Sequence, residues 1–335
     1  MDKRVIFAVA GSGKTTHIVN SLTTEKRSLI ITYTTSNYSN IAEKIAKKFH
    51  GKWPENITLM SYFQFLYRFC YKPFLSDSVR ARGMVYEQNP NRFIRQSDCA
   101  FYLTPKRYFY SNRLSLYLER KNVLSDIKQR IVDYFDEFII DEVQDIAGRD
   151  FTFLEHLMDA NLNMLFVGDF YQHTYDTSRD GNANRSLFAD KKVYEARFAR
   201  KGVIPDSTTL VRSWRCRKSI CEFVTSNLGI EILSYDDTED HSIRFVSEPT
   251  ERTRIINDTR ITKLHFKESY TFGQGRKNWG DTKGEDCYED VCVMLNKNTA
   301  KLYKQGKLCE LAPSTRNKLY VAITRAHGCV YLMYE

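Results

Sequence analysis

A short loop near the N-terminus has the residue types and spacing of a phosphate-binding turn. It follows an apolar run, residues 5–8, and precedes a helical segment that begins near His17. Backbone N–H groups of such a loop, together with a helix N-terminus, can enclose phosphate oxygens. We expect Lys14 to reach the β and γ phosphates and the Thr15 hydroxyl to reach magnesium. The residues expected to contact the nucleotide are Ala10, Gly11, Ser12, Gly13, Lys14, Thr15 and Thr16.

Two carboxylates supply a second half for a hydrolytic site. They are Asp141 and Glu142, directly after the apolar run 138–140. Asp141, at the expected strand tip, would hold the magnesium shell, and Glu142 is placed to polarise the attacking water. An acidic pair alone is common, but together with a phosphate loop it favours a hydrolase over a passive nucleotide binder. We therefore predict ATP and Mg²⁺ as the ligands.

The elements that must position these groups alternate along the chain. Short runs rich in β-branched residues are separated by helical stretches, which predicts parallel sheets with ligand sites at the carboxyl ends of the strands. The runs are residues 5–8, 29–33, 138–141, 164–167, 209–211, 243–245, 291–295 and 330–333. Each sheet would form the core of an α/β domain.

The length of 335 residues allows two domains of ordinary size. Turn-forming residues between 200 and 207 predict the boundary, so we expect an N-terminal domain over residues 1–205 and a C-terminal domain over residues 206–335. The stretch from about 72 to 130 is rich in arginine and tyrosine and lacks a clear period. It predicts a small, mostly helical insertion in the first domain.

Composition narrows the function classes. Fifty basic residues against 41 acidic ones give a formal charge of +9, which permits a polyanionic partner without demonstrating one. The eight cysteines include no C-x-x-C pair, so buried thiols in a reduced compartment are expected rather than a zinc knuckle. The apolar run at the N-terminus is too short for a signal peptide or a membrane span. We expect a cytoplasmic monomer with no membrane partner.

The sequence Asp141-Glu142-Val143-Gln144-Asp145 resembles the D-E-x-Q-D box of superfamily 1A helicases of the UvrD/Rep/PcrA type. Further segments resemble the other boxes of that family, in chain order. They are residues 32–34 (motif Ia), 61–65 (Ib), 167–175 (III), 210–216 (IV), 281–286 (V) and 320–326 (VI). Because the matches cover nearly the whole chain, the resemblance implies two RecA-like P-loop NTPase domains with parallel sheets.

The same resemblance implies roles for further residues. Gln172 would sense the γ-phosphate, and Arg215 and Arg325 would act on its charge as arginine fingers. The alternative for Arg215 is that it stacks on Trp214 or faces solvent. The acidic residue near the ribose would be Asp286 or its neighbour Glu285. The residues implied to contact a nucleic acid strand are Tyr33, Thr34, Tyr62, Phe63, Tyr175 and Thr282.

We therefore predict an ATP-driven translocase or helicase on single-stranded DNA, with RNA as the other substrate that the sequence allows. Travel would be 3′ to 5′ by analogy alone. Only about 65 residues separate motifs IV and V, where larger relatives carry a subdomain, so a protein partner would supply duplex engagement. An ATP-switched nucleic-acid-binding or signalling subunit with little turnover is the alternative. A small-molecule kinase ranks last, since residues 320–326 would have no role in it.

Overall fold

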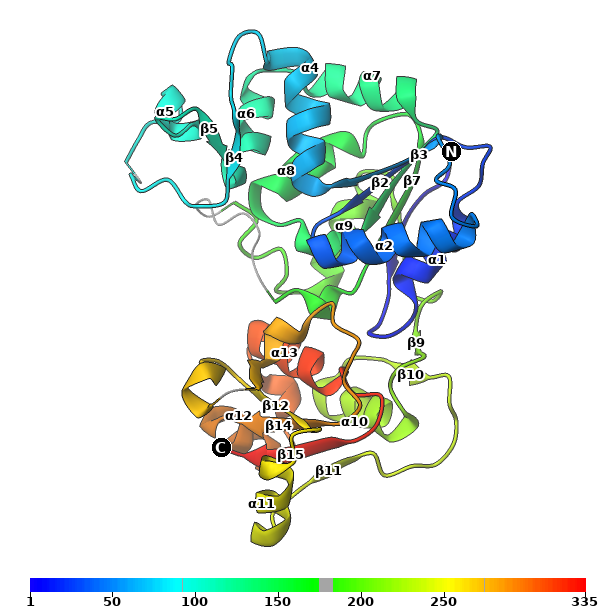
Figure 1. Ribbon diagram of the computed structural model, residues 1–335, viewed down its shortest axis with the longest axis vertical. Coiled ribbons are helices and arrows are strands. Elements are labelled where there is room, and N and C mark those ends of the chain that lie inside the picture. The colour runs from blue at the N-terminus through cyan, green and yellow to red at the C-terminus, as the bar shows by residue number, and fades with distance from the viewer. Residues whose placement is uncertain (92, 175–182, 274) are drawn as a thin grey trace. The chain divides into compact units, whose positions relative to one another are not determined.

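The computed structural model describes residues 1–91, 93–174, 183–273 and 275–335. The chain divides into two compact units (Figure 1). The first unit comprises residues 1–6, 15–168 and 175–206, and the second comprises residues 7–14, 169–174 and 207–335. The long segment of the second unit thus begins at residue 207, close to the expected boundary at 205. Two short segments of the N-terminal half, residues 7–14 and 169–174, nevertheless belong to the second unit.

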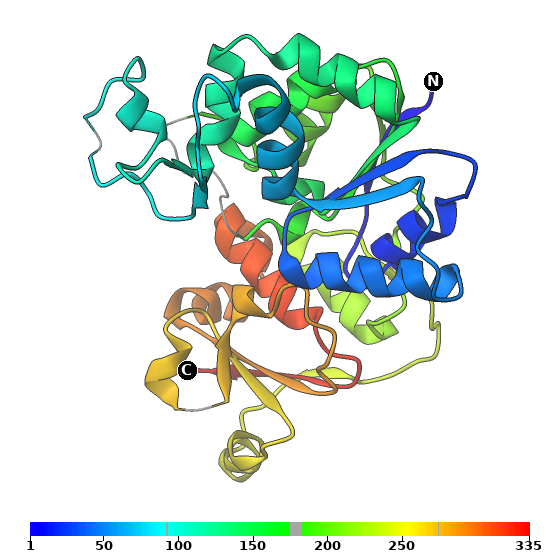
Figure 2. The same ribbon diagram turned by 45° about the horizontal axis from the view of Figure 1, so that its top comes forward.

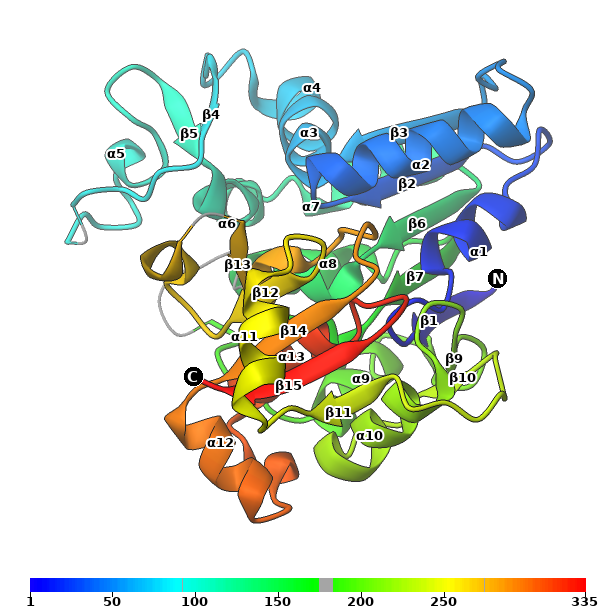
Figure 3. The same ribbon diagram turned by 60° about the horizontal axis from the view of Figure 1, so that its bottom comes forward.

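Six strands form the central sheet of the first unit, in the order β3-β2-β6-β7-β1-β8. Figure 3 labels the strands from β3 to β1 in this order. Their bounds are Lys3–Phe7 (β1), Ser28–Thr32 (β2), Ile57–Ser61 (β3), Glu137–Asp141 (β6), Asn163–Gly168 (β7) and Ile204–Asp206 (β8). The pairs β2–β3, β2–β6, β6–β7 and β1–β8 are parallel. The four strands predicted in this half are confirmed to within a few residues. The sequence did not predict the two edge strands, β3 and β8, and β8 lies inside the expected boundary turn.

Helices and a small insertion complete the first unit. The helices are α1 (Lys14–Ser21), α2 (Thr35–Lys48), α3 (Tyr62–Gln64), α4 (Lys72–Leu75), α5 (Cys99–Tyr102), α6 (Leu114–Arg120), α7 (Leu124–Tyr134), α8 (Gly148–Leu157) and α9 (Lys191–Ala199). A π-helical stretch, Phe65–Tyr71, connects α3 to α4. The insertion is not purely helical, because β4 (Gly83–Val85) and β5 (Tyr108–Tyr110) pair in parallel within it. Figures 1 and 2 show this segment, in cyan, projecting from one side of its unit.

The second unit is built on a five-stranded parallel sheet in the order β11-β15-β14-β12-β13. Its strands are Ile243–Phe245 (β11), Thr262–His265 (β12), Arg276–Asn278 (β13), Val291–Leu295 (β14) and Val330–Tyr334 (β15). A separate pair consists of β9 (Arg212–Ser213) and β10 (Leu233–Ser234). The helices are α10 (Lys218–Leu228), α11 (Pro249–Asn257), α12 (Lys297–Lys304) and α13 (Pro313–Ile323).

One predicted strand is wrong. Residues 209–211 form no strand; instead, the carbonyl of Leu210 accepts the N–H of Val9 at 2.9 Å. A strand in a sheet and an extended segment beside the phosphate loop can have the same local hydrophobicity. The sequence pattern could therefore not distinguish them.

The sheet cores explain why the parallel arrangement forms. Every residue of β14 is buried, as is every residue of β2. Strands covered on both faces read as continuous apolar runs, which is typical of parallel sheets flanked by helices. The surface helix α2 shows the complementary pattern, with Ile41 and Ile45 buried and Thr34 as its N-cap. In the part of the chain that the structure describes, no helix combines the length and hydropathy needed to span a membrane.

Candidate active site

The phosphate loop connects β1 to α1 and has the geometry that its glycines predict. Gly11 and Gly13 have φ angles of 70° and 84°, in the left-handed region that glycine enters without steric cost. The Ser12 hydroxyl donates to the carbonyl of Val9 at 2.8 Å and closes the turn. Lys14 opens helix α1. The loop and the helix N-terminus thus have the arrangement that binds phosphate groups.

Segment 213–215 passes very close to this loop inside the second unit. The N–H of Trp214 donates to the carbonyl of Gly11 at 2.9 Å. A Cβ atom built on Gly11 would lie 2.6 Å from Ser213 Oγ and 2.7 Å from Arg215 Cβ. Only glycine therefore fits at position 11, for two independent reasons: its φ angle and this close approach. The same contact places the Arg215 backbone beside the phosphate loop.

The oxygen atoms expected to hold magnesium meet in the first unit. Thr15 Oγ1 lies 3.3 Å from Asp141 Oδ2, and Asp141 is buried at the end of β6. A hydroxyl and a carboxylate are hard oxygen ligands, and Mg²⁺ characteristically takes only one or two protein ligands besides phosphate and water. These residues therefore fit the ion. Thr16 turns elsewhere, because its hydroxyl accepts from Lys44 Nζ at 2.9 Å.

Glu142 is held in an unusual conformation by its surroundings. Its φ and ψ angles are 59° and 47°, in the left-handed region, and it is 8% exposed. The Gln144 amide donates to Glu142 Oε2. A Cβ on Gly168 would lie 2.2 Å from Gln144 Oε1, so the glycine at the end of β7 makes room for this amide. Non-glycine residues in the left-handed region cost about 1–3 kcal/mol and are concentrated at functional sites. Gln144 thus orients the carboxylate, a role that the box alone did not reveal.

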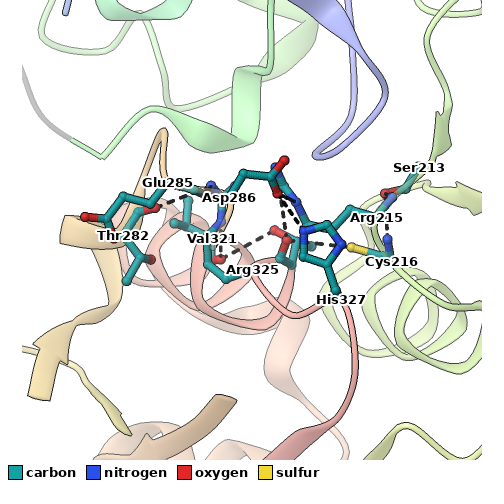
Figure 4. Close-up of polar contacts among 10 residues, drawn as sticks. Ser213, Arg215, Cys216, Thr282, Glu285, Asp286, Val321, Arg325 and His327 are labelled. Atoms are coloured by element: carbon teal, nitrogen blue, oxygen red, sulfur yellow. Dashed lines mark hydrogen bonds and ion pairs between the residues drawn. The ribbon is translucent and has the colours of Figure 1, made fainter. Parts of the chain in front are cut away.

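Arg215 meets Asp286 in the second unit (Figure 4). Arg215 Nε lies 2.6 Å from Asp286 Oδ1, and Arg215 Nη1 donates to the Thr324 carbonyl at 3.2 Å. The ring of His327 lies 2.9 Å from the same carboxylate oxygen. Burial opposes the charge of Asp286, but Arg215 and His327 hold its pKa below the usual range. The predicted ribose contact, Asp286, is therefore an ion-pair partner of a predicted arginine finger.

Arg325 does not have the orientation that the resemblance implied. It is 2% exposed, and its guanidinium donates to the carbonyls of Val321 (3.3 Å), Thr282 (3.4 Å) and Glu285 (3.1 Å). Burial and the nearby Arg215 lower the pKa of Arg325 to about 10. The side chain thus supports residues 282–285 of the motif V segment. The predicted contact of Arg325 with the γ-phosphate stays a prediction.

Thr282, predicted to contact a strand, is also enclosed. It is buried, and its hydroxyl donates to the carbonyl of Trp279 at 3.0 Å. The prediction is corrected for a physical reason: Thr282 lies in a short 3-10 helix, Trp279–Thr282, and its hydroxyl closes that turn rather than facing solvent. Tyr175, another predicted strand contact, lies outside the described residues. Gln172 is buried in the second unit, on the 3-10 turn Phe170–Gln172.

The aromatic residues of motifs Ia and Ib form one cluster in the first unit. The ring of Phe63 lies edge-on to Tyr33 at 5.3 Å and edge-on to Tyr86 at 5.1 Å between ring centroids. Phe63 is nearly buried, Tyr33 is half-buried, and Tyr86 is 71% exposed. Thr34 caps helix α2 by accepting from the Asn37 N–H at 3.2 Å. Sequence reasoning missed Tyr86, because it comes from the insertion and carries no motif signal.

Tyr62 is buried, unlike the exposed Tyr86 of the neighbouring aromatic cluster. Its side chain is 3% exposed, and its hydroxyl faces the fully buried carboxyl of Asp150. Burial raises the pKa of Asp150 to about 7, although the hydroxyls of Ser115 and Tyr62 oppose that rise. The predicted stacking role of Tyr62 is therefore corrected, because Tyr62 begins helix α3 with its side chain packed inside the unit.

A second exposed aromatic pair lies next to the phosphate loop. Trp214 and Tyr235 stack with ring centroids 3.6 Å apart and an interplanar angle of 16°. Both rings are exposed. Because the backbone N–H of Trp214 donates a hydrogen bond to the Gly11 carbonyl, the two stacked rings lie near the nucleotide-binding loop. The sequence offered only a weak signal, an aromatic residue beside the motif IV arginine.

Comparisons with known proteins agree with this architecture. The chain matches the AAA_19 family model, described as an AAA domain, over residues 2–178, just over half of its length. No curated protein sequence matches it. Two solved structures of arterivirus nonstructural protein 10, a helicase, align with it: one in complex with DNA (13% identity, TM-score 0.51, 100% of this chain and 60% of that chain) and one described without it (13%, 0.51, 99% and 59%).

The structural likeness shows a shared fold and no more, and the chain spans about 60% of the length of those helicases. Two parallel α/β sheets, a phosphate loop and the ordered boxes all lie within one chain. The chain belongs to the AAA_19 family of AAA domains and shares the fold of those solved helicase structures, with two RecA-like units.

Proposed function

We propose that this protein hydrolyses ATP with Mg²⁺ and uses the turnover to move along single-stranded DNA. The observation that carries the proposal is the contact of Thr15 with Asp141 at 3.3 Å. It brings the residue after the phosphate-loop lysine to the acidic strand end, with Glu142 next to it in the chain. Loop, metal ligands and general base are the parts that phosphoryl transfer to water requires.

The acidic residues have separate tasks in this reaction. When bound, Mg²⁺ neutralises charge on the phosphate oxygens, and Thr15 and Asp141 would hold it. Glu142 accepts the proton of the attacking water, and the Gln144 amide keeps its carboxylate oriented. Lys14 binds the β and γ phosphates from the start of helix α1.

Arg215 is the cation that we assign to the transition state. Its backbone already lies against Gly11, so only its side chain has to move. The Arg215 guanidinium forms an ion pair with the Asp286 carboxylate. A phosphate group is also an anion whose oxygens accept hydrogen bonds from a guanidinium. We propose that Arg215 exchanges Asp286 for the γ-phosphate. Arg325 acts less directly, by holding the carbonyls of Thr282 and Glu285 and thereby the segment that carries Asp286.

The Trp214–Tyr235 pair is the surface that we assign to the nucleotide base. A flat, exposed indole next to the phosphate loop can stack on a purine without reading its edges. This assignment gives the nucleotide a base contact. It also implies modest base selectivity, since every base has an aromatic face.

Single-stranded DNA is proposed as the track for two reasons. The formal charge of +9 favours a polyanion, and the cluster of Tyr33, Phe63 and Tyr86 presents an exposed ring for base stacking. One of the structurally similar arterivirus helicases was solved with DNA, which supports the same class of ligand here. The direction, 3′ to 5′, follows from the resemblance alone, and displacement of streptavidin from either end of a strand tests it.

The decisive experiment is steady-state ATP hydrolysis with and without an unstructured DNA or RNA strand. We expect turnover that a strand stimulates and that Glu142→Gln lowers by about 10²–10⁴. Tyr86→Ala should weaken the stimulation while leaving basal turnover unchanged, with Tyr134→Ala, another exposed tyrosine of the first unit, as the matched control. Absence of hydrolysis under all conditions would overturn the proposal. Strand affinity should also fall steeply as salt rises, because phosphate contacts release counterions.

One observation favours a second candidate, an ATP-dependent switch with little turnover. The Arg325 guanidinium is buried and occupied by three carbonyls, so this motif VI cation serves structure rather than phosphate. In that case ATP would bind and change strand affinity, but no strand would accelerate hydrolysis. The same assay, combined with strand binding in the presence of a non-hydrolysable ATP analogue, separates the two functions.

A further inference from the structure

The hydroxyl of Tyr320 is a buried junction in the second unit. Tyr320 lies on helix α13, and its side chain is fully buried. Its hydroxyl donates to Asp169 Oδ2 at 2.9 Å and accepts the N–H of Ala10 at 2.8 Å. Burial and the neighbouring Asp169 raise the pKa of Tyr320 well above its usual value, so the hydroxyl keeps its proton and remains a donor.

Each partner of this hydroxyl belongs to a different functional segment. Ala10 lies in the phosphate loop. Asp169 begins the 3-10 turn that carries Gln172: its Oδ1 accepts the N–H of Tyr171 at 3.0 Å, and its carbonyl accepts the N–H of Gln172 at 2.9 Å. One phenolic oxygen therefore joins the loop, the turn and helix α13.

Helix α13 in turn holds Arg215. The helix ends at Ile323, and the carbonyl of the next residue, Thr324, accepts from Arg215 Nη1 at 3.2 Å. A shift of α13 would thus move an anchor of the Arg215 side chain. A buried hydroxyl with two partners fixes the position of the helix against the loop, because leaving either partner unpaired is costly.

We propose that the Tyr320 hydroxyl is a positioning group that holds the phosphate loop, the Gln172 turn and the Arg215 anchor in mutual register for ATP hydrolysis. This role rests on the proposed function. Tyr320 does not contact substrate; it acts through Ala10, Asp169 and helix α13. The role is separate from phosphate binding itself, which the rest of the loop and Lys14 perform.

The test is Tyr320→Phe, which removes one oxygen atom and keeps the ring that fills the core. We expect kcat for ATP to fall about 10- to 100-fold, as for loss of a buried hydrogen bond to a charged group, while KM for ATP and strand affinity stay within about threefold. Tyr303→Phe, in the same unit, is the matched control, because its hydroxyl has no hydrogen bond to any described residue. Its kcat should be unchanged. A purely structural role would instead lower the thermal midpoint and affect KM and kcat together.

A double-mutant cycle identifies the path. If Tyr320 acts through Asp169 on Gln172, then Tyr320→Phe in a Gln172→Ala background should slow hydrolysis by much less than it does in the native chain. Independent, multiplicative effects would overturn that path. Unchanged kcat in Tyr320→Phe, with native turnover present, would overturn the positioning role alone. Absence of turnover in the native chain would instead remove the proposed function on which the role rests.

Discussion

The acidic and basic residues proposed to act on ATP are held in different ways. Asp141 and Glu142 are placed by the main chain, at a strand end and in a left-handed turn. Arg215 reaches its present partners through a long side chain, which binds the Asp286 carboxylate and the Thr324 carbonyl. A carboxylate fixed by its backbone needs no rearrangement for catalysis, whereas an arginine with an intramolecular partner must exchange it. The acidic half is therefore preorganised, and the basic half is exchangeable.

The largest expected effect is on the exchangeable half. Arg215→Ala should lower kcat by about 10³–10⁵, the range for arginine fingers, with KM for ATP changed little. Arg215→Lys should recover only part of the loss, because lysine keeps the charge but lacks the planar fork. Steady-state hydrolysis with a saturating strand measures both. A loss below tenfold in Arg215→Ala would assign the residue to structure and remove the partner exchange.

The preorganised half is tested by Glu142→Gln. The amide keeps the size of the side chain but cannot accept the proton of water, so kcat should fall about 10²–10⁴. Binding of a fluorescent ATP analogue should remain. Glu137→Gln, at the opposite end of the same strand, where it accepts the Ser28 hydroxyl at 2.6 Å, is the control and should retain full activity. Equal activities of the two variants would contradict the assignment of Glu142 as the base.

Asp286→Asn measures the cost of exchange directly. If the carboxylate competes with phosphate for Arg215, the variant should lower KM for ATP. The effect should reach at most about fivefold, because a partly exposed ion pair contributes only about 0–1 kcal/mol. A role of Asp286 at the ribose predicts the opposite, a higher KM. Asp281→Asn, in the same segment, serves as the control, and the sign of the change in KM decides between the two roles.

The smallest expected effect is on stability and concerns a carboxyl that takes no part in the chemistry. The folded pKa of Asp150, about 7, lies above the usual value near 4. Its contribution to stability is therefore fully present below about pH 4 and is lost as pH rises through about 7. Asp150→Asn should flatten the decline of the thermal midpoint between pH 5 and pH 8. The exposed Asp126→Asn should leave the native slope unchanged, and an unaltered slope in Asp150→Asn would refute the assignment.

Much of the fold and of the acidic half was predictable, because both depend on local patterns. Short apolar runs predicted seven strands that the structure confirms, and the run before Asp141 placed the carboxylates at a strand end. The failures were also local in origin. Residues 209–211 have the same hydrophobicity as a strand but pair with Val9 at the phosphate loop, and β8 is a short edge strand with a proline at its centre.

The sequence by itself determined which groups are available: the phosphate loop, the acid pair, the arginines and the ordered boxes. Only the tertiary structure decided where they point. Tyr62 is buried against Asp150, and Tyr86 of the insertion packs against Phe63. The Arg325 guanidinium donates hydrogen bonds to backbone carbonyls. The physical reason is that side-chain direction and partners depend on packing between segments distant in the chain, which a local pattern does not specify. The Tyr320 junction, with partners 310 and 151 residues away, shows this dependence most clearly.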